Sequence, residues 1–261
     1  MRSFVLSGIF VSVVLLAGCG GGGSGSNPDN STAATGIHAE GLYLQTNTVR
    51  IQKSNFIIKD EFIFGISGST DSDGQMLYAD GVSSGFGSSK NGTYSASMNY
   101  YSDKDYVSTL SASDGKVNYL NGTLTTGSVS QPFEANSPST AAYNYDNAAS
   151  IDDVSGAWIV NGSTNFTVNK IDSRGGFISG SYFPLLTAGP CTFSGTIIPD
   201  TKKNVYFITI TDSRTAACGV SGGLVSRGFA ASYLLQNGKR QLLIMTQTSG
   251  VNLSRGFAGV R

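Results

Sequence analysis

The sequence predicts an all-β protein with two tandem antiparallel meander domains, the second of which closes into a small barrel or a strongly curled sheet. Three observations lead to this expectation. Apolar and polar residues alternate in short runs, tight-turn dipeptides separate these runs, and no stretch after Gly36 sustains an apolar repeat at helical spacing. A signal peptide and a Gly/Ser-rich tether precede the folded part.

The first 36 residues predict an exported, lipid-anchored protein. Arg2 precedes a mostly apolar stretch, residues 4–16, which is too short for a permanent membrane-spanning helix and is typical of a signal peptide. The letters LAGC, which end at Cys19, resemble the bacterial lipobox. This resemblance implies a signal peptide over residues 1–18 and acylation of Cys19, so that residues 19–36 form the lipidated cysteine and a flexible linker.

The lipid anchor also predicts a location. Each buried methylene contributes about 0.8 kcal/mol, so a several-chain modification holds a protein stably at a membrane. Inner-membrane lipoproteins of enteric bacteria commonly carry aspartate after the lipidated cysteine, whereas Gly20 stands there in this chain. The resemblance therefore implies the outer membrane, and it leaves open whether the protein faces the periplasm or the cell surface.

The composition excludes some partners. The chain has 17 basic and 17 acidic side chains, and cleavage before Cys19 removes Arg2, which leaves one more acid than base. Without a basic excess to neutralise phosphates, nucleic acid is not an expected partner. Charged residues are only 13% of the chain, while glycine is abundant, and this composition is typical of exported β-proteins.

The predicted strands are short runs rich in β-branched and aromatic residues. They cover residues 94–100, 107–110, 177–182, 205–211 and 241–247. Asn-Gly and Asp-Gly dipeptides suit the positive φ angles of tight hairpins, so we expect consecutive strands to pair in antiparallel fashion. These dipeptides begin at Asp73, Asn91, Asp114, Asn121, Asn161 and Asn237.

The chain divides into two halves that open alike. GLY at residues 41–43 begins the first meander and GAW at residues 156–158 begins the second. The segment between the meanders, residues 131–150, contains two prolines and little strand character, so it is the predicted connector. The predicted domains are therefore residues 37–130 and residues 151–261.

The second half resembles the opening hairpins of avidin-type barrels. The stretch GAWIVNGSTNFTVNKIDSRGGFISGSY, residues 156–182, shares with them a Gly-x-Trp start, a Ser-Arg-Gly turn and a Phe-x-x-Gly-x-Tyr strand. The resemblance implies a calycin-like meander barrel in which Trp158 plugs one end. The biotin site of that family needs several tryptophans and Trp158 is the only tryptophan of this chain, so the topology carries over and the ligand does not.

Most of the mature chain also resembles a group of two-domain lipoproteins of Gram-negative bacteria with no settled activity. The stretches that carry this resemblance are residues 120–125, 145–158, 191–211 and 215–219. The resemblance implies a fold and a location, and it implies no chemistry.

Two cysteines remain after the anchor, Cys191 and Cys218. Neither lies in a metal-ligand spacing, and an even pair in an exported protein predicts a disulfide. The hairpin expected near residues 200–204 would bring the start of one strand beside the loop that follows the next. The alternative is a pair of buried free thiols.

The sequence contains little that predicts catalysis. The only histidine, His38, lies at the edge of the tether, where nothing would hold it rigidly for nucleophilic or metal chemistry. Neighbouring acids such as Asp152 and Asp153 would point to opposite faces of a strand, which makes them poor acid–base pairs. We therefore expect no enzyme activity, no cofactor and no metal.

Two weaker patterns remain. The loop from residue 69 to residue 80 partly matches a calcium loop through Asp71, Asp73 and Asp80, although a hairpin turn capped by aspartates explains the same letters. Tyrosines combine contact area with a hydroxyl, so a cluster of them is a possible binding surface or ordinary strand filling. This cluster consists of Tyr94, Tyr100, Tyr101 and Tyr106.

Two classes of function follow from these patterns. The first is a membrane-anchored, non-enzymatic lipoprotein that acts as a binding or envelope-interaction module with an unknown protein or small-molecule partner. The alternative is a lipoprotein that binds a small ligand or inhibits an enzyme through a barrel mouth, by analogy with its fold alone. A cavity open at one end of the second barrel would favour the alternative, and a filled barrel interior would favour the first class.

Overall fold

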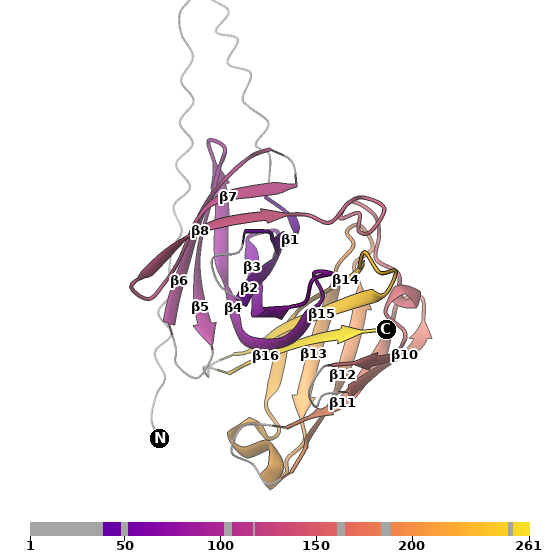
Figure 1. Ribbon diagram of the computed structural model, residues 1–261. Helices are drawn as coiled ribbons and strands as arrows, with labels where there is room; N and C mark the ends of the chain where they lie inside the picture. The colour runs from indigo at the N-terminus through magenta and orange to yellow at the C-terminus, as the bar shows by residue number, and fades with distance from the viewer. Residues whose placement is uncertain are drawn as a thin grey trace, which may run out of the picture. The chain divides into compact units, whose positions relative to one another are not determined.

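The computed structural model confirms an all-β chain with two tandem closed barrels, each of eight antiparallel strands (Figure 1). It describes residues 39–47, 52–101, 106–116, 118–160, 165–183, 189–249 and 253–261. The predicted signal peptide, the anchor Cys19 and the tether lie outside the described residues. Within the described part, no helix is long and apolar enough to cross a membrane.

The first barrel is an up-and-down meander in which the first strand pairs with the last through Leu44 and Asn136. Its strands are β1 (Gly41–Gln45), β2 (Gln52–Lys59), β3 (Phe62–Thr70), β4 (Met76–Lys90), β5 (Thr93–Tyr101), β6 (Tyr106–Lys116), β7 (Tyr119–Thr126) and β8 (Val129–Asn136). This half was expected to be a meander, and closure removes the exposed sheet edges that a meander would otherwise leave.

The second barrel has the same order and closes where β9 lies between β10 and β16. Its strands are β9 (Gly156–Ile159), β10 (Asn165–Asp172), β11 (Gly175–Tyr182), β12 (Cys191–Pro199), β13 (Tyr206–Asp212), β14 (Val225–Leu234), β15 (Arg240–Thr248) and β16 (Ser254–Val260). A short 3-10 helix, η1 (Ile151–Asp153), precedes β9, and another, η2 (Ala216–Ser221), follows β13.

The two similar openings share a glycine with a positive φ. Gly41 has a φ of 149° and Gly156 has a φ of 119°, and both angles lie where side chains are rarely tolerated. Each glycine is the first residue of the first strand of its barrel. The predicted likeness of the two starts therefore extends to a glycine with positive φ at the head of each barrel.

The predicted connector, residues 131–150, begins too early. Residues 131–136 belong to β8, so the connection between the barrels starts after Asn136. Pro132 favours a break in the strand, but the backbone continues as part of β8. The O atom of Pro132 accepts from the Asn47 side chain, and the O atom of Glu134 accepts from the N–H of Thr46, so both face the side of β1. Among the described residues β1 pairs with β8 only through Leu44–Asn136 and Gln45–Ala135, so Pro132 lies beyond the described ladder, where a missing N–H is tolerated.

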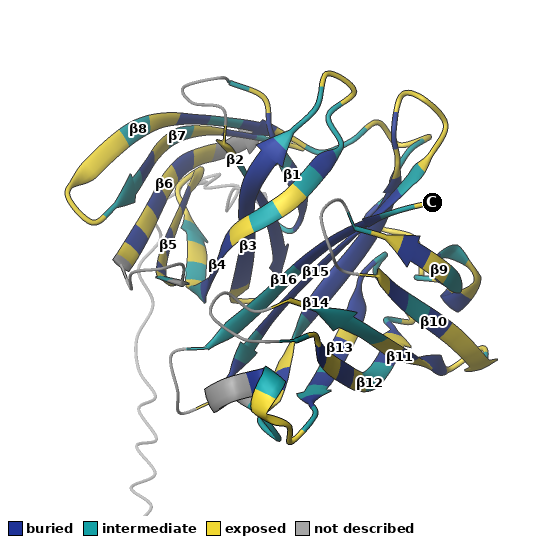
Figure 2. Ribbon diagram, turned by 60° about the horizontal axis from the view of Figure 1, so that its bottom comes forward, coloured by how far each residue is buried: buried dark blue, intermediate teal, exposed yellow. Residues whose placement is uncertain are grey.

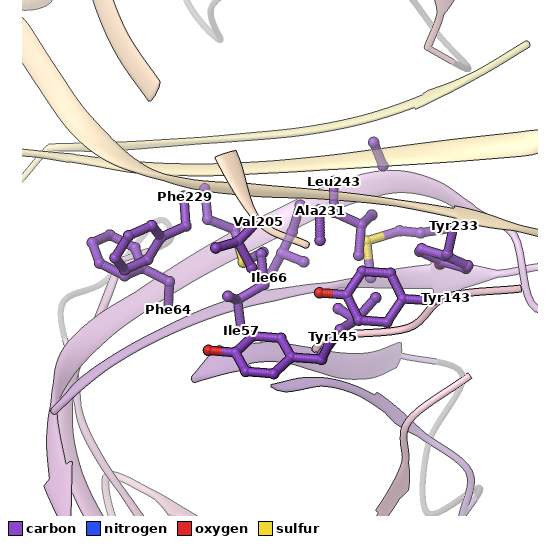
Figure 3. Close-up of a cluster of buried hydrophobic side chains, with 14 of the residues drawn as sticks. Ile57, Phe64, Ile66, Tyr143, Tyr145, Val205, Phe229, Ala231, Tyr233 and Leu243 are labelled. Atoms are coloured by element: carbon purple, nitrogen blue, oxygen red, sulfur yellow. The ribbon is translucent and has the colours of Figure 1, made fainter. Parts of the chain in front are cut away.

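The barrels pack against each other through apolar outer faces. Ile57, Phe64 and Ile66 of the first barrel lie in one buried cluster with Phe229 and Leu243 of the second (Figure 3). The rings of Phe64 and Phe229 meet edge to face at 5.4 Å between centroids. Strand β15 is buried along nearly its whole length because one face lines its own barrel and the other meets the neighbouring barrel (Figure 2).

A fully buried glutamine fixes the register of this contact. The Gln241 amide donates to the O atom of Met76 and accepts from the N–H of Met76, both at 2.9 Å, as a neighbouring strand would. The Tyr233 hydroxyl donates to the same amide oxygen at 2.8 Å. This side chain of the second barrel thus satisfies the backbone of the first where β4 begins.

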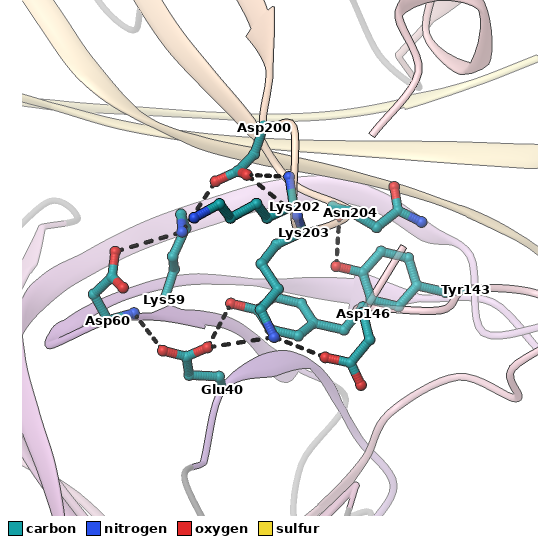
Figure 4. Close-up of polar contacts among 10 residues, drawn as sticks. Glu40, Lys59, Asp60, Tyr143, Asp146, Asp200, Lys202, Lys203 and Asn204 are labelled. Atoms are coloured by element: carbon teal, nitrogen blue, oxygen red, sulfur yellow. Dashed lines mark hydrogen bonds and ion pairs between the residues drawn. The ribbon is translucent and has the colours of Figure 1, made fainter. Parts of the chain in front are cut away.

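Charged groups line one side of the same contact (Figure 4). The Lys59 ammonium lies 3.0 Å from the Asp200 carboxylate and 3.4 Å from that of Asp60. Burial opposes the charge of Lys59, but hydrogen bonds to the two carboxylates and their negative charges raise the pKa of Lys59. Burial likewise opposes ionisation of Asp200, yet the N–H groups of Lys202 and Lys203, together with Lys59, lower the pKa of Asp200.

Candidate functional site

The interior of the second barrel is filled with side chains. A single buried cluster extends from Trp158 and Phe166 near β9 to Phe257 on β16, and the rings of Phe193 and Phe257 stack at 4.9 Å. The other members are mainly isoleucine, valine, leucine and tyrosine side chains. An open cavity in this barrel would have favoured the small-ligand alternative, and the packed interior gives that alternative no support here.

Trp158 lies at the end of the second barrel that η1 covers. Its indole is 1% exposed and donates to the O atom of Val154 at 2.7 Å. The Arg261 guanidinium lies 4.7 Å from the ring centroid and donates to backbone O atoms of the η1 segment, including Asp153 at 3.0 Å. The side chain predicted to plug the barrel is therefore buried between the barrel core and the C-terminal arginine.

The interior of the first barrel is filled over only part of its length. An apolar layer occupies the part near Ala39, and its aromatic members include Phe56 and Phe133, whose rings meet edge to face at 5.4 Å. The remaining members of the layer are Tyr43, Ile58, Ile63, Tyr94, Ala96, Met98, Leu110, Ala112, Leu120, Leu124 and Ala135. Beyond Phe56 and Leu124 the inward side chains change from apolar to polar.

Polar side chains at this level come from seven consecutive strands, β2 to β8. We call them the polar ring: Ser54, Ser67, Ser83, Tyr100, Ser108, Thr126 and Gln131. Strand register brings several of them opposite each other, because Ser83 pairs with Tyr100 and Ser108 with Thr126. The ring is thus a cross-section of the barrel, with nearly every strand contributing one polar group.

A cavity of about 350 Å³ lies inside the polar ring. Phe56 and Leu124 form its apolar floor, while the exposed residues Gln52, Ser128 and Val129 line it near the solvent. Its volume lies at the lower end of the range typical of small-molecule sites. The barrel therefore offers a concave site with an apolar floor and polar walls.

The hydrogen bonds of the wall hold the hydroxyls in pairs. Ser54 and Ser67 are joined by a bond of 2.8 Å between their Oγ atoms, and Ser108 and Thr126 by one of 3.0 Å. At the rim, the Gln52 amide donates to the Asp80 carboxylate at 2.8 Å. Among the described residues that line the cavity, none carries a charge.

The four predicted binding tyrosines have different positions. Tyr94 is 2% exposed and belongs to the apolar layer, so it is a core residue and its assignment to a binding surface is wrong. Burial raises the pKa of its hydroxyl. Tyr100 lines the cavity, whereas Tyr101 and Tyr106 lie on β5 and β6 with side chains outside the described part.

The aspartate loop between β3 and β4 forms a hairpin turn. The Asp71 carboxylate accepts from the N–H groups of Asp73 and Gln75, both at 2.9 Å, which is how aspartate caps a turn. Asp73 accepts from Asn237 of the second barrel. The described part of the chain contains no group of three potential metal-ligating side chains.

The predicted disulfide is present. Cys191 and Cys218 are bonded, with their Cα atoms 4.6 Å apart. Cys191 begins β12 and Cys218 lies in η2, so the bond ties the loop after β13 to the start of its neighbouring strand. Both residues are buried, which suits a structural role.

Comparisons of the chain with protein-family models, curated proteins and solved structures find no match.

Proposed function

We propose that this is a membrane-anchored, non-enzymatic binding protein of the cell envelope that holds a small ligand inside the polar ring. The observation that supports the proposal is the cavity of about 350 Å³ in the first barrel, with an apolar floor and a wall of hydroxyls and amides. Such concave sites with a few convergent polar groups are where small molecules bind. The proposal adopts the barrel-mouth alternative and moves it from the second barrel to the first.

The chemistry of the wall favours binding over catalysis. Hydrolytic and group-transfer sites use an acid, a base or an activated nucleophile held in contact with its partner. The described residues that line the cavity provide serine, threonine and tyrosine hydroxyls, and no imidazole, thiol, carboxylate or amine lines it beside them. Hydroxyls without such a partner orient a ligand but do not activate it.

A substitution inside the ring is expected to abolish ligand binding. Ser83 is 4% exposed and lines the cavity, so the larger apolar side chain of Ser83→Leu would occupy the space and remove a polar group. We expect at least a tenfold loss of affinity for any small molecule that binds the wild type. Saturation-transfer NMR against a library of charged, apolar and uncharged polar compounds identifies the ligand, and calorimetry measures the loss.

The matched control is Ser88→Leu, because Ser88 lies on the same strand and is exposed. This variant should bind as the wild type does. If the wild-type protein binds no compound of any class, the proposal fails and the envelope-interaction class is favoured instead.

The proposed anchor predicts a change of location. Cys19→Ala should release the protein from the membrane fraction and abolish metabolic labelling with palmitate, since the thiol would be the site of acylation. Fractionation of inner and outer membranes tests the proposed outer-membrane position of the wild type. A Cys19→Ala protein that stays with the membrane unchanged would contradict the proposed anchor.

A further inference from the structure

We propose that the ligand of the polar ring is an uncharged polyhydroxylated molecule the size of one sugar ring, either a free monosaccharide or the end residue of a longer glycan. This inference rests on the proposed function and specifies its ligand. Four properties of the cavity lead to it: its charge, its size, its hydroxyl pairs and its floor.

The absence of charge from the described lining argues against ionic ligands. Carboxylate and phosphate groups are recognised by arginine or lysine side chains, or by converging backbone N–H groups. The walls instead present the hydroxyls of Ser83 and Ser108 and the amide of Gln131. A ligand carboxylate placed among them would lose its water without gaining a cation.

The size of the cavity fits one sugar ring. Since one water molecule takes about 30 Å³ of liquid, a cavity of about 350 Å³ corresponds to roughly a dozen waters. A hexose has about a dozen non-hydrogen atoms, but bonded atoms pack more closely than separate waters, so one sugar ring would displace roughly half of this water and the remainder would stay around it. The open end, near Ser128 and Val129, would let the rest of a longer glycan extend into solvent.

The paired hydroxyls suit a ligand that both donates and accepts. In the Ser54–Ser67 pair one hydroxyl gives its hydrogen to the other, which leaves the second hydrogen and several lone pairs for other contacts. The Ser108–Thr126 pair has the same capacity on the opposite side of the ring. Sugar hydroxyls match both roles, whereas an apolar ligand would remove water from these groups without replacing its hydrogen bonds.

The floor complements the other face of a sugar. Phe56 and Leu124 present carbon to the cavity, and Phe56 is held by its edge-to-face contact with Phe133. A pyranose has C–H groups on its ring faces and hydroxyls around its edge. With a face on this floor, its edge hydroxyls would point toward the polar ring.

Calorimetric titration of the full-length, detergent-solubilised protein tests the inference. The probes are D-glucose, D-galactose and D-mannose as uncharged sugars, D-glucuronate as a charged analogue and 1-octanol as an apolar molecule. We expect saturable binding of at least one uncharged sugar, at least tenfold weaker binding of glucuronate, and no saturable binding of octanol.

Two single substitutions on strand β6 test whether the sugar binds inside the polar ring. Ser108 is 1% exposed and lines the cavity, while Ser111 is exposed on the outer face of β6. Ser108→Val should weaken sugar binding at least tenfold and Ser111→Val should leave it within twofold, with circular dichroism and melting curves to verify that both are folded.

The outcomes separate this inference from the proposed function. If glucuronate or octanol binds in a manner that Ser83→Leu abolishes while no sugar binds, the ligand class is wrong and the proposed function stands. If sugar affinity falls equally in both valine variants or in neither, the ring is not the sugar site. If no probe and no library compound binds the wild type, both proposals fail.

Discussion

Arg255→Met is expected to destabilise the protein by about 3–5 kcal/mol, since removing one partner of a buried ion pair leaves the other charge uncompensated. The guanidinium of Arg255 donates to the Asp212 carboxylate at 2.8 Å, and the Tyr182 hydroxyl donates to the same oxygen at 3.0 Å. Asp212 is 5% exposed. Methionine would fill most of the volume of the arginine stem. The loss of stability would therefore come mainly from the missing charge and only to a small extent from an empty cavity.

Chemical denaturation followed by circular dichroism measures this loss. For a chain of this size, the melting temperature should fall by roughly 6–20 °C. The matched control is Arg174→Met, because Arg174 forms a comparable 2.7 Å pair with Asp172 on the surface, where its side chain is 89% exposed. Exposed pairs contribute about 0–1 kcal/mol, so equal losses in the two variants would contradict the assigned role of burial.

The double variant Cys191→Ala/Cys218→Ala should lose about 3–4 kcal/mol of stability, because the disulfide closes a loop of about 28 residues and restricts the unfolded chain. The native contacts around η2 should change little, since both side chains are buried and alanine fits within their volume.

Denaturation of the oxidised wild type, the reduced wild type and the double variant measures the contribution. The last two proteins should agree with each other and should both unfold at lower denaturant concentration than the oxidised form. Equal midpoints for all three would contradict a stabilising disulfide. Peptide mapping without reduction should recover one species that joins Cys191 to Cys218.

Much of the fold could be predicted because its signals are local. Asn91-Gly92 lies in a tight turn in which both residues have a positive φ, and Asn237-Gly238 lies in a turn in which Gly238 has one, as the Asn-Gly dipeptides predict. Asn121-Gly122 has the same signal but lies inside β7, where a side chain at Gly122 would collide with the backbone of Ser111 on β6. Here the glycine is required because two neighbouring strands approach each other closely. The sequence alone does not distinguish this requirement from that of a tight turn.

The candidate site was missed because it depends on which side chains share one level of a barrel. Along β6, Leu110 and Ala112 mark the inward positions, and the same alternation places Ser108 inward. This alternation can be read from the sequence, but it predicts only which face of the strand a side chain lies on. The level is fixed by the stagger between neighbouring strands, and that stagger becomes known only when Ser108 is found opposite Thr126.

The contact between the barrels has a consequence for the order in which the chain folds. Synthesis from the N-terminus completes β1–β8 before β14 and β15 exist, so the newly formed first barrel presents Ile57, Phe64 and Ile66 to its surroundings. During that interval the backbone of Met76 also lacks the amide of Gln241. A chain halted after residue 150 would therefore expose this apolar surface, and a chaperone would have its best opportunity to bind at this stage.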